Sequence, residues 1–473
     1  MRDRRFITSQ VITLLFQIVL NALLFVTFFS ILSLNNPQII NLSRTAATTM
    51  ATFVIILALL NFVYGGHDPG KKKARSLFSS ILLSALFADV ITYLQLQIMN
   101  VNPENNPRLI LFGEDIIWLS LIIALQIGLI YFLITIVYFF DRRLNPPQSC
   151  CIVTSSQELA AHVSKKIASF RHRFQLLEVA HYECPDIHET IRRHDVIFLA
   201  GIPDTEEGQL QNLCYAQNKT IYLLAELEDV VISTAQQIIL DDTPFLYIHR
   251  VEPTLLQRFI KRLIDIAFSL IGLILFMPVM LIAAGCLFLS DRHGPIFFFQ
   301  KRATLHGHVF EIIKFRTMYG NAPGEAETAF SARENDARIT PLGRVLRQFR
   351  IDELPQLYNV LRGDMSIVGP RPEMLANVAK YEQEVPEFKY RQQMKAGLTG
   401  LAQIDGKYNT SPKDKAILDL FYIENFSLLT DWKLIMRTLT IFFRRDSTEG
   451  FGTSHRKKTN CPKMRTAAES HTP

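Results

Sequence analysis

Four long apolar runs near the start of the chain constrain its fold more than any other feature of the sequence. They cover roughly residues 6–34, 45–64, 77–99 and 116–140. Each run reaches the ~20 residues that an α-helix needs to cross the hydrocarbon of a bilayer. With 49% hydrophobic and only 20% charged residues, the chain is too apolar to be wholly soluble in water. The sequence therefore predicts a four-helix transmembrane domain in residues 1–145.

Basic residues are distributed unevenly between the loops of this predicted domain. A cluster at residues 71–75 separates the second and third runs, and Arg142 and Arg143 follow the fourth, whereas the other two loops carry only Arg44 and Arg108. Positively charged loops stay on the cytoplasmic side, so both ends of the bundle should face the cytoplasm. The net charge of +6 is modest and gives no reason to expect a nucleic-acid partner.

Short apolar runs alternate with segments of helical pattern in residues 146–250, which indicates a small parallel α/β domain of the Rossmann-like kind. The last of these runs is Phe245–Ile248. After the first run, Val153–Gln157 contains no glycine where a dinucleotide site would need G-x-G-x-x-G. We therefore predict a regulatory or oligomerisation domain, with a nucleotide ligand as the alternative.

A fifth apolar run covers residues 263–289, and Pro278 lies near its centre. Basic residues flank it on both sides, namely Arg258, Lys261, Arg262, Arg292, Lys301 and Arg302. Both flanks should prefer the cytoplasmic leaflet, and proline removes a backbone hydrogen bond from a helix. We predict a re-entrant helix-break-helix hairpin that enters one leaflet and returns, with a straight span as the alternative.

Two adjacent carboxylates, Asp352 and Glu353, precede Pro355 and an apolar stripe at helical spacing. This pattern places the acids at a helix N-terminus, where the helix dipole would keep Asp352 ionised and suited to attack phosphorus. Ordinary helix capping is the alternative. The arginines Arg344, Arg347 and Arg350 line one helical face that ends at the acids, and guanidinium groups suit phosphate oxygens, although a solvated basic face is the usual explanation.

From about residue 258 to 443 the chain resembles the bacterial sugar transferase family, the polyprenyl-phosphate hexose-1-phosphate transferases that initiate exopolysaccharide, capsule and O-antigen synthesis. The blocks that carry the resemblance are Lys261-Arg262-x-x-Asp265, Gly294-Pro295, Gln300-x-Arg302, Lys314–Met318, Asp352–Gln356, Asn359–Ser366, Val368–Pro372, Gly397–Gln403 and Asp419-x-x-Tyr422 with Asn425, Ser427 and Asp431. The preceding spans and Rossmann-like domain look like the long form of that family. Thr304 and Ala396 depart from the usual glycine and proline.

The resemblance implies an enzyme of the bacterial inner membrane that transfers a sugar 1-phosphate, glucose or galactose, from a UDP-sugar to undecaprenyl phosphate and releases UMP. It implies a covalent phosphosugar-aspartate on Asp352, with Mg²⁺ at that residue and Glu353 as its acid partner, assisting the metal or the acceptor. The substrate-binding residues carried over are Lys314, Arg316, Arg302, Arg371, Arg350 and Gln403. The lipid bilayer is a further partner, and a homodimer stays open.

The predicted architecture is thus a membrane α-helical bundle plus α/β: four transmembrane helices, the Rossmann-like domain, and residues 255–445 as re-entrant hairpin and α/β-type cytoplasmic catalytic domain. Residues 446–473 are predicted to be disordered. Two other functions are less compatible with the sequence. A glycosidase or glycosyltransferase pair is disfavoured because neighbouring residues in one turn cannot easily flank a glycosidic bond from two faces ~5–10 Å apart. A non-catalytic membrane scaffold for polysaccharide assembly is disfavoured by the intact acid pair and its cations.

Overall fold

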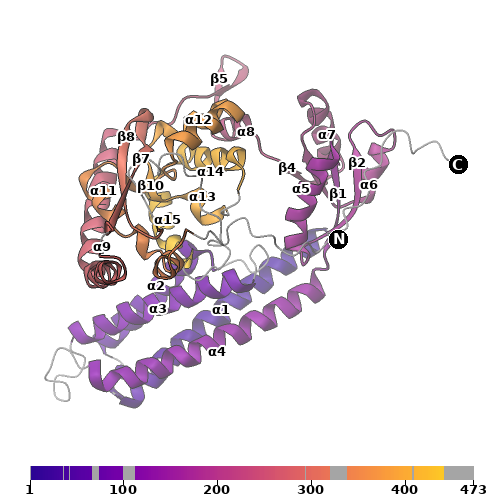
Figure 1. Cartoon of the computed structure of the whole chain (residues 1–473). Coiled ribbons are helices and arrows are strands. Elements are labelled where there is room, and N and C mark those ends of the chain that lie inside the picture. The colour runs from indigo at the N-terminus through magenta and orange to yellow at the C-terminus, as the bar shows by residue number, and fades with distance from the viewer. Residues whose placement is uncertain are drawn as a thin grey trace. The chain divides into compact units, whose positions relative to one another are not determined.

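The structure is a computed structural model that describes residues 2–35, 37–41, 43–66, 74–99, 112–292, 294–319, 338–406 and 410–441 (Figure 1). The chain divides into two compact units between Leu224 and Ala225. Three features predicted from the sequence lie outside the described residues: the lysines at 71–73, Arg108, and the tail 446–473. The exact limits of the domains within these units stay a prediction.

The first unit begins with four long helices that lie side by side (Figure 1). They are α1 (Arg2–Asn35), α2 (Arg44–Tyr64), α3 (Ala74–Ile98) and α4 (Phe112–Leu144), with the short η1 (Pro37–Ile39) after α1. Each contains a stretch long and apolar enough to cross a membrane. Phe28, Phe53 and Ile81 are completely buried between them, while many other apolar side chains face outward. The predicted helical, apolar N-terminal region is confirmed, and its path through a bilayer stays a prediction.

A parallel four-stranded sheet completes the first unit, in the order β2-β1-β3-β4. Its elements are β1 (Gln148–Thr154), α5 (Gln157–Ile167), η2 (Ala168–Phe170), β2 (Phe174–His181), α6 (Ile187–Arg193), β3 (Val196–Ala200), α7 (Asp204–Ala216) and β4 (Thr220–Leu223). Side chains of β1 alternate between two apolar clusters, Cys150 and Ile152 in one and Cys151 and Val153 in the other. Burial on both faces explains why the strand appears in the sequence as a continuous apolar run.

The run Phe245–Ile248 does not join this sheet, contrary to the prediction. Instead, β5 (Gln236–Leu240) and β6 (Thr243–Tyr247) form an antiparallel hairpin in the second unit, after α8 (Leu227–Ser233). Only Asp241 and Asp242 connect the two strands, and Asp241 has a φ of 59°. A two-residue connection can only reverse the chain, so parallel pairing is excluded for these strands.

The second unit contains the fifth apolar helix and a mixed α/β domain. Its remaining elements are α9 (Leu255–Ser290), β7 (Phe297–Ala303), η3 (Leu305–Gly307), β8 (Val309–Phe315), α10 (Pro341–Gln348), η5 (Ile351–Glu353), α11 (Gln356–Arg362), β9 (Ser366–Val368), α12 (Leu375–Glu384), η6 (Pro386–Gln393), β10 (Gly397–Thr399), α13 (Leu401–Asp405), α14 (Pro412–Glu424) and α15 (Leu428–Ile441). β7 pairs antiparallel with β8, and β9 pairs parallel with β10. A core that includes Ile312, Val360, Val368 and Ile423 joins these elements.

The helix α9 runs unbroken through Pro278, so the predicted interruption is absent. Proline removes only its own donor, and hydrogen bonds on either side can continue the helix. The buried residues of α9 nevertheless form two separate groups, Asp265 and Ser269 before Pro278 and Ala283 and Leu287 after it. Apolar side chains between them are exposed, among them Leu270, Ile271, Ile274, Leu275, Phe276, Met277, Val279, Leu281 and Ile282.

Candidate active site

A buried asparagine holds the β7–β8 hairpin against the segment that carries the acid pair. The Asn359 side chain in α11 accepts a hydrogen bond from the Ile313 N–H (3.0 Å) and donates one to the Glu311 carbonyl oxygen (2.8 Å). Both partners lie in β8, so the amide pairs with the strand edge as a neighbouring strand would. This contact sets Lys314, the next residue of β8, beside Glu353.

The two acids lie in the separate 3₁₀ turn η5 rather than at the cap of α11, which corrects the predicted position. Pro355 occupies the N-cap position of α11. Arg350 precedes this turn and separates it from α10, and its backbone is in the left-handed region with φ 53° and ψ 24°. A non-glycine residue in this conformation costs about 1–2 kcal/mol, so the surrounding contacts must compensate.

Glu353 is bound by three cationic side chains. Its Oε1 lies 3.0 Å from Lys314 Nζ and 3.0 Å from Arg371 Nη2, and its Oε2 lies 3.6 Å from Arg350 Nη1. Burial favours the protonated acid, but the positive charges of Lys314, Arg371 and Arg350 outweigh it and hold the pKa of Glu353 well below its usual range. Glu353 is thus a permanent anion that holds the cations in place.

Asp352, unlike Glu353, has no cationic side chain bound to its carboxylate among the described residues. It is only 9% exposed, and its carboxylate forms no hydrogen bond or ion pair with the residues that the structure describes. Burial, followed by repulsion from Glu353, raises the pKa of Asp352 to about 6, although Lys314 and Arg347 partly oppose this. The helix dipole predicted to keep Asp352 ionised is therefore not the dominant effect. The residue combines a raised pKa with free oxygens, which is the usual state of a group available for chemistry.

A small pocket adjoins Glu353. Its lining residues are Arg302, Ile312, Lys314, Glu353, Gln356, Arg371, Pro372, Gly397 and Leu398. Gly397 allows the close approach of two chain segments there, because a Cβ atom on it would lie 2.1 Å from the Gly369 backbone nitrogen. The charged lining residues other than Glu353 are cationic, so the pocket suits an anion.

Four of the six predicted substrate-binding residues meet around Glu353, and two do not. Lys314, Arg371 and Arg350 contact Glu353, and Arg302 lines the pocket. Arg316 instead forms an ion pair with Asp291 (2.5 Å), and Gln403 faces the carbonyl oxygens of Gly397 and Leu398 at 3.5 and 3.4 Å.

A second buried network of polar side chains supports Arg371. The sequence analysis did not predict it. Arg391 donates to Asp419 Oδ2 from Nη2 (2.6 Å) and from Nε (3.0 Å), and its Nη2 also lies 2.9 Å from the Arg371 carbonyl oxygen. Glu373 joins the network through Arg391 Nη1, 3.9 Å from its Oε1, and also pairs with Lys415 at 3.3 Å. Asp419 belongs to a recognised motif, but nothing in the spacing connects it to Arg391.

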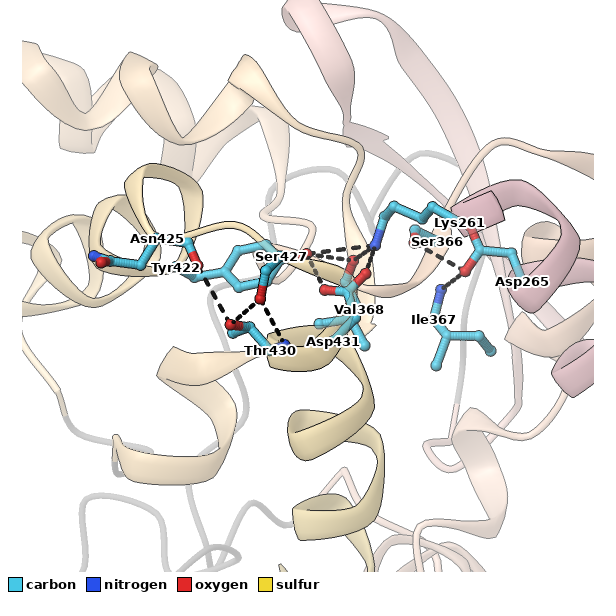
Figure 2. Close-up of polar contacts among 10 residues, drawn as sticks. All are labelled: Lys261, Asp265, Ser366, Ile367, Val368, Tyr422, Asn425, Ser427, Thr430 and Asp431. Carbon is cyan, nitrogen blue, oxygen red and sulfur yellow. Dashed lines mark hydrogen bonds and ion pairs between the residues drawn. The ribbon is translucent and has the colours of Figure 1, made fainter. Parts of the chain in front are cut away.

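The beginning of α9 is fastened to β9 by two side chains one turn apart (Figure 2). Lys261 Nζ donates to the Val368 carbonyl oxygen (2.9 Å) and pairs with Asp431 Oδ2 (2.5 Å), while Asp265 Oδ1 accepts from the Ile367 N–H (2.8 Å) and from Ser366 Oγ (3.0 Å). The Tyr422 hydroxyl donates to Asp431 Oδ1 (2.8 Å).

Around the same network, Ser427 and Thr430 share a hydrogen bond and Thr430 donates to the Asn425 carbonyl oxygen (Figure 2). The contacts of Lys261 and Asp265, by contrast, position the apolar helix α9 against β9, the strand that leads to Arg371.

Comparison with known proteins identifies the class. Residues 256–445 match the family model described as bacterial sugar transferase. A Caulobacter vibrioides protein named UDP-glucose:undecaprenyl-phosphate glucose-1-phosphate transferase is 40% identical over 192 residues, 40% of this chain and 71% of that protein. The chain therefore belongs to the bacterial sugar transferase family, and the predicted family is confirmed.

Two longer relatives are matched over less than half of their length. An Aeromonas hydrophila UDP-N-acetylgalactosamine-undecaprenyl-phosphate N-acetylgalactosaminephosphotransferase is 39% identical over 203 residues, 42% of this chain and 46% of that protein. A Salmonella typhimurium undecaprenyl-phosphate galactose phosphotransferase is 34% identical over 227 residues, 43% of this chain and 46% of that protein. These names all describe sugar phosphotransferases, and they differ in the sugar.

Proposed function

We propose that the chain transfers a sugar 1-phosphate from a UDP-sugar to undecaprenyl phosphate and releases UMP, as the first membrane step of exopolysaccharide, capsule or O-antigen synthesis. The observation that carries this proposal is the acid pair. Glu353 is saturated by Lys314, Arg371 and Arg350, whereas Asp352 beside it is buried and free of hydrogen bonds from the described residues. One acid organises positive charge for a phosphate group, and the other is available to attack it.

In the proposed reaction, a carboxylate oxygen of Asp352 attacks the phosphorus that bears the sugar. The bond from that phosphorus to the bridging oxygen breaks, and UMP leaves with the electron pair. An oxygen of the lipid phosphate then attacks the same phosphorus and releases the Asp352 carboxylate. The cations around Glu353 stabilise the negative charge on the phosphoryl oxygens in both steps.

Mg²⁺ is the cofactor that this proposal includes. The described residues contain no group of three or more His, Cys, Asp or Glu side chains that could hold a metal by themselves. Mg²⁺ is usually held by one or two carboxylates together with substrate phosphates, and the free oxygens of Asp352 fit that role. When bound, the ion would neutralise charge on the phosphates.

The sugar is proposed to be glucose or galactose, which the Caulobacter and Salmonella relatives are named for. Membranes containing the protein should release UMP from one UDP-sugar of a panel when undecaprenyl phosphate is supplied, and Asp352→Asn should abolish that release while the protein still inserts and folds. A fully active Asp352→Asn variant would refute the role of Asp352. Inactivity of the wild type with every UDP-sugar would favour the scaffold.

The proposed position is the cytoplasmic face of the membrane, with the continuous helix α9 bent at Pro278 so that both of its ends lie in the same leaflet. Both ends of α9 pack on one body: Asp265 and Ser269 near its start, Ala283 and Leu287 near its end. In addition, Val230 of α8 packs against Ile417 and Leu420 of α14. These elements precede and follow α9 in the chain, so a helix that crossed the bilayer would have to separate residues that touch.

A further inference from the structure

Gln356 is a buried polar residue that lines the pocket. The sequence assigns it no role, and it does not contact the acid pair by a hydrogen bond. It is the first residue of α11 and is 3% exposed. Neither end of its carboxamide forms a hydrogen bond with the residues that the structure describes, and its Nε2 is buried. Buried amide groups are nearly always paired in folded proteins, so an unpaired one that lines a pocket indicates a missing partner.

Arg302 provides a second unpaired donor on the same pocket. Its Nη1 donates to the Pro372 carbonyl oxygen (3.3 Å) and its Nη2 to Gln300 Oε1 (2.5 Å), which leaves Nε buried without a partner among the described residues. The pocket therefore contains two unused N–H donors, and Lys314 and Arg371 add positive charge beside them. A ligand that matches this lining accepts hydrogen bonds and carries negative charge.

We propose that the Gln356 side-chain N–H, together with Arg302 Nε, binds a phosphoryl oxygen of a substrate. This inference rests on the proposed function, because both of its substrates bring phosphoryl oxygens: the diphosphate of the UDP-sugar and the phosphate of the lipid. An amide donates a hydrogen bond without adding charge. Gln356 can therefore fix the orientation of the phosphoryl group without changing the net charge of the site, which Glu353 and its cations determine.

The test removes the amide and measures each substrate separately. Gln356→Met keeps a similar volume and loses both polar ends, and Gln348→Met on the exposed surface of α10 is the matched control. We expect Gln356→Met to lower kcat/KM about 10- to 100-fold, the effect of losing a hydrogen bond to a charged group, while Gln348→Met leaves it unchanged.

Two arms identify the source of the phosphoryl oxygen. If it belongs to the UDP-sugar, release of UMP in the absence of lipid slows in Gln356→Met. If it belongs to the lipid phosphate, that release is normal and the KM for undecaprenyl phosphate rises. Unchanged kinetics in both arms would overturn the inference.

A binding measurement keeps this test independent of turnover and of folding defects. The thermal unfolding midpoint of each detergent-solubilised variant is measured with and without UDP and with and without undecaprenyl phosphate. The wild type and Gln348→Met should be stabilised by at least one of these, and Gln356→Met should lose most of that increment even if its own midpoint is lower. Full retention of the increment in Gln356→Met would count against the inference, whereas a wild type that binds but transfers no sugar would refute only the proposed function.

Discussion

Thr304 and Ala396, two residues that depart from the usual pattern of the family, are hydrogen-bonded to each other. The Ala396 N–H donates to Thr304 Oγ1 (3.0 Å), and the Thr304 hydroxyl donates to the Asp364 carbonyl oxygen (3.2 Å). Both residues are buried. Proline has no N–H, so alanine at this position introduces a donor that the threonine hydroxyl satisfies.

We therefore expect Thr304→Val to lower the free energy of unfolding by about 1–3 kcal/mol, because it leaves the Ala396 N–H buried without an acceptor. Adding Ala396→Pro to Thr304→Val removes that donor and should recover part of the loss. Denaturant unfolding of the single and double variants measures both effects. Strictly additive losses would show that the two positions are independent.

The raised pKa of Asp352 predicts how activity depends on pH. Below about pH 6 the carboxylate becomes protonated and loses its nucleophilic form, so kcat/KM should fall as the pH drops through that value. Arg347 lowers this pKa by its positive charge. Arg347→Gln should thus move the acidic limb to higher pH, by about half a pH unit, equivalent to about 0.7 kcal/mol.

Arg344→Gln is the control for that profile, because Arg344 lies on the same helix with an exposed side chain. Its profile should coincide with that of the wild type. An acidic limb that stays in place in Arg347→Gln would show that a group other than Asp352 limits the reaction at low pH.

At the level of elements, the parts of the fold that depend on local pattern were predictable. Apolar length alone indicated α1 to α4, and the residues of the acid pair and three of its cations followed from motifs. The 3₁₀ turn around Asp352 was not predictable, because the left-handed backbone of Arg350 does not change the spacing of apolar residues in the sequence. The partners of Arg316 and Gln403 were also missed, since tertiary contacts decide which cation meets which acid.

The start of α9 allows a direct comparison of a buried with an exposed ion pair. Lys261 and Asp431 are 12% and 4% exposed at their side chains, whereas Arg258 and Glu252 are 56% and 61% exposed. Lys261→Met should destabilise the protein by about 3–5 kcal/mol, because it leaves the buried Asp431 carboxylate with the Tyr422 hydrogen bond but without a cationic partner. Arg258→Met should change stability by less than about 1 kcal/mol.

Unfolding of both variants in detergent measures this difference. Adding Asp431→Asn to Lys261→Met removes the unpaired charge and should restore part of the stability. Equal losses for Lys261→Met and Arg258→Met would mean that α9 does not depend on its contact with the catalytic domain.

For the whole molecule, the contact between α8 and α14 predicts that the segments before and after α9 share one side of the membrane. Single cysteines at Glu228 and at Lys389, both exposed positions, should be labelled by an impermeant maleimide in inverted membrane vesicles and not in intact spheroplasts. A cysteine at Asn41, between α1 and α2, should show the reverse pattern. Labelling of Glu228→Cys and Lys389→Cys from opposite sides would refute the re-entrant path.

The same contact has a consequence for biogenesis. The chain reaches α14 only long after α9 has been synthesised, because α14 begins at Pro412 and α9 ends at Ser290. While α9 emerges from the ribosome, the Ile417 and Leu420 side chains that later cover Val230 do not yet exist. In the proposed topology, the apolar segment of α9 must therefore be kept from translocation by the basic residues that flank it, and the later contact between α14 and α8 then holds both segments on one side of the membrane.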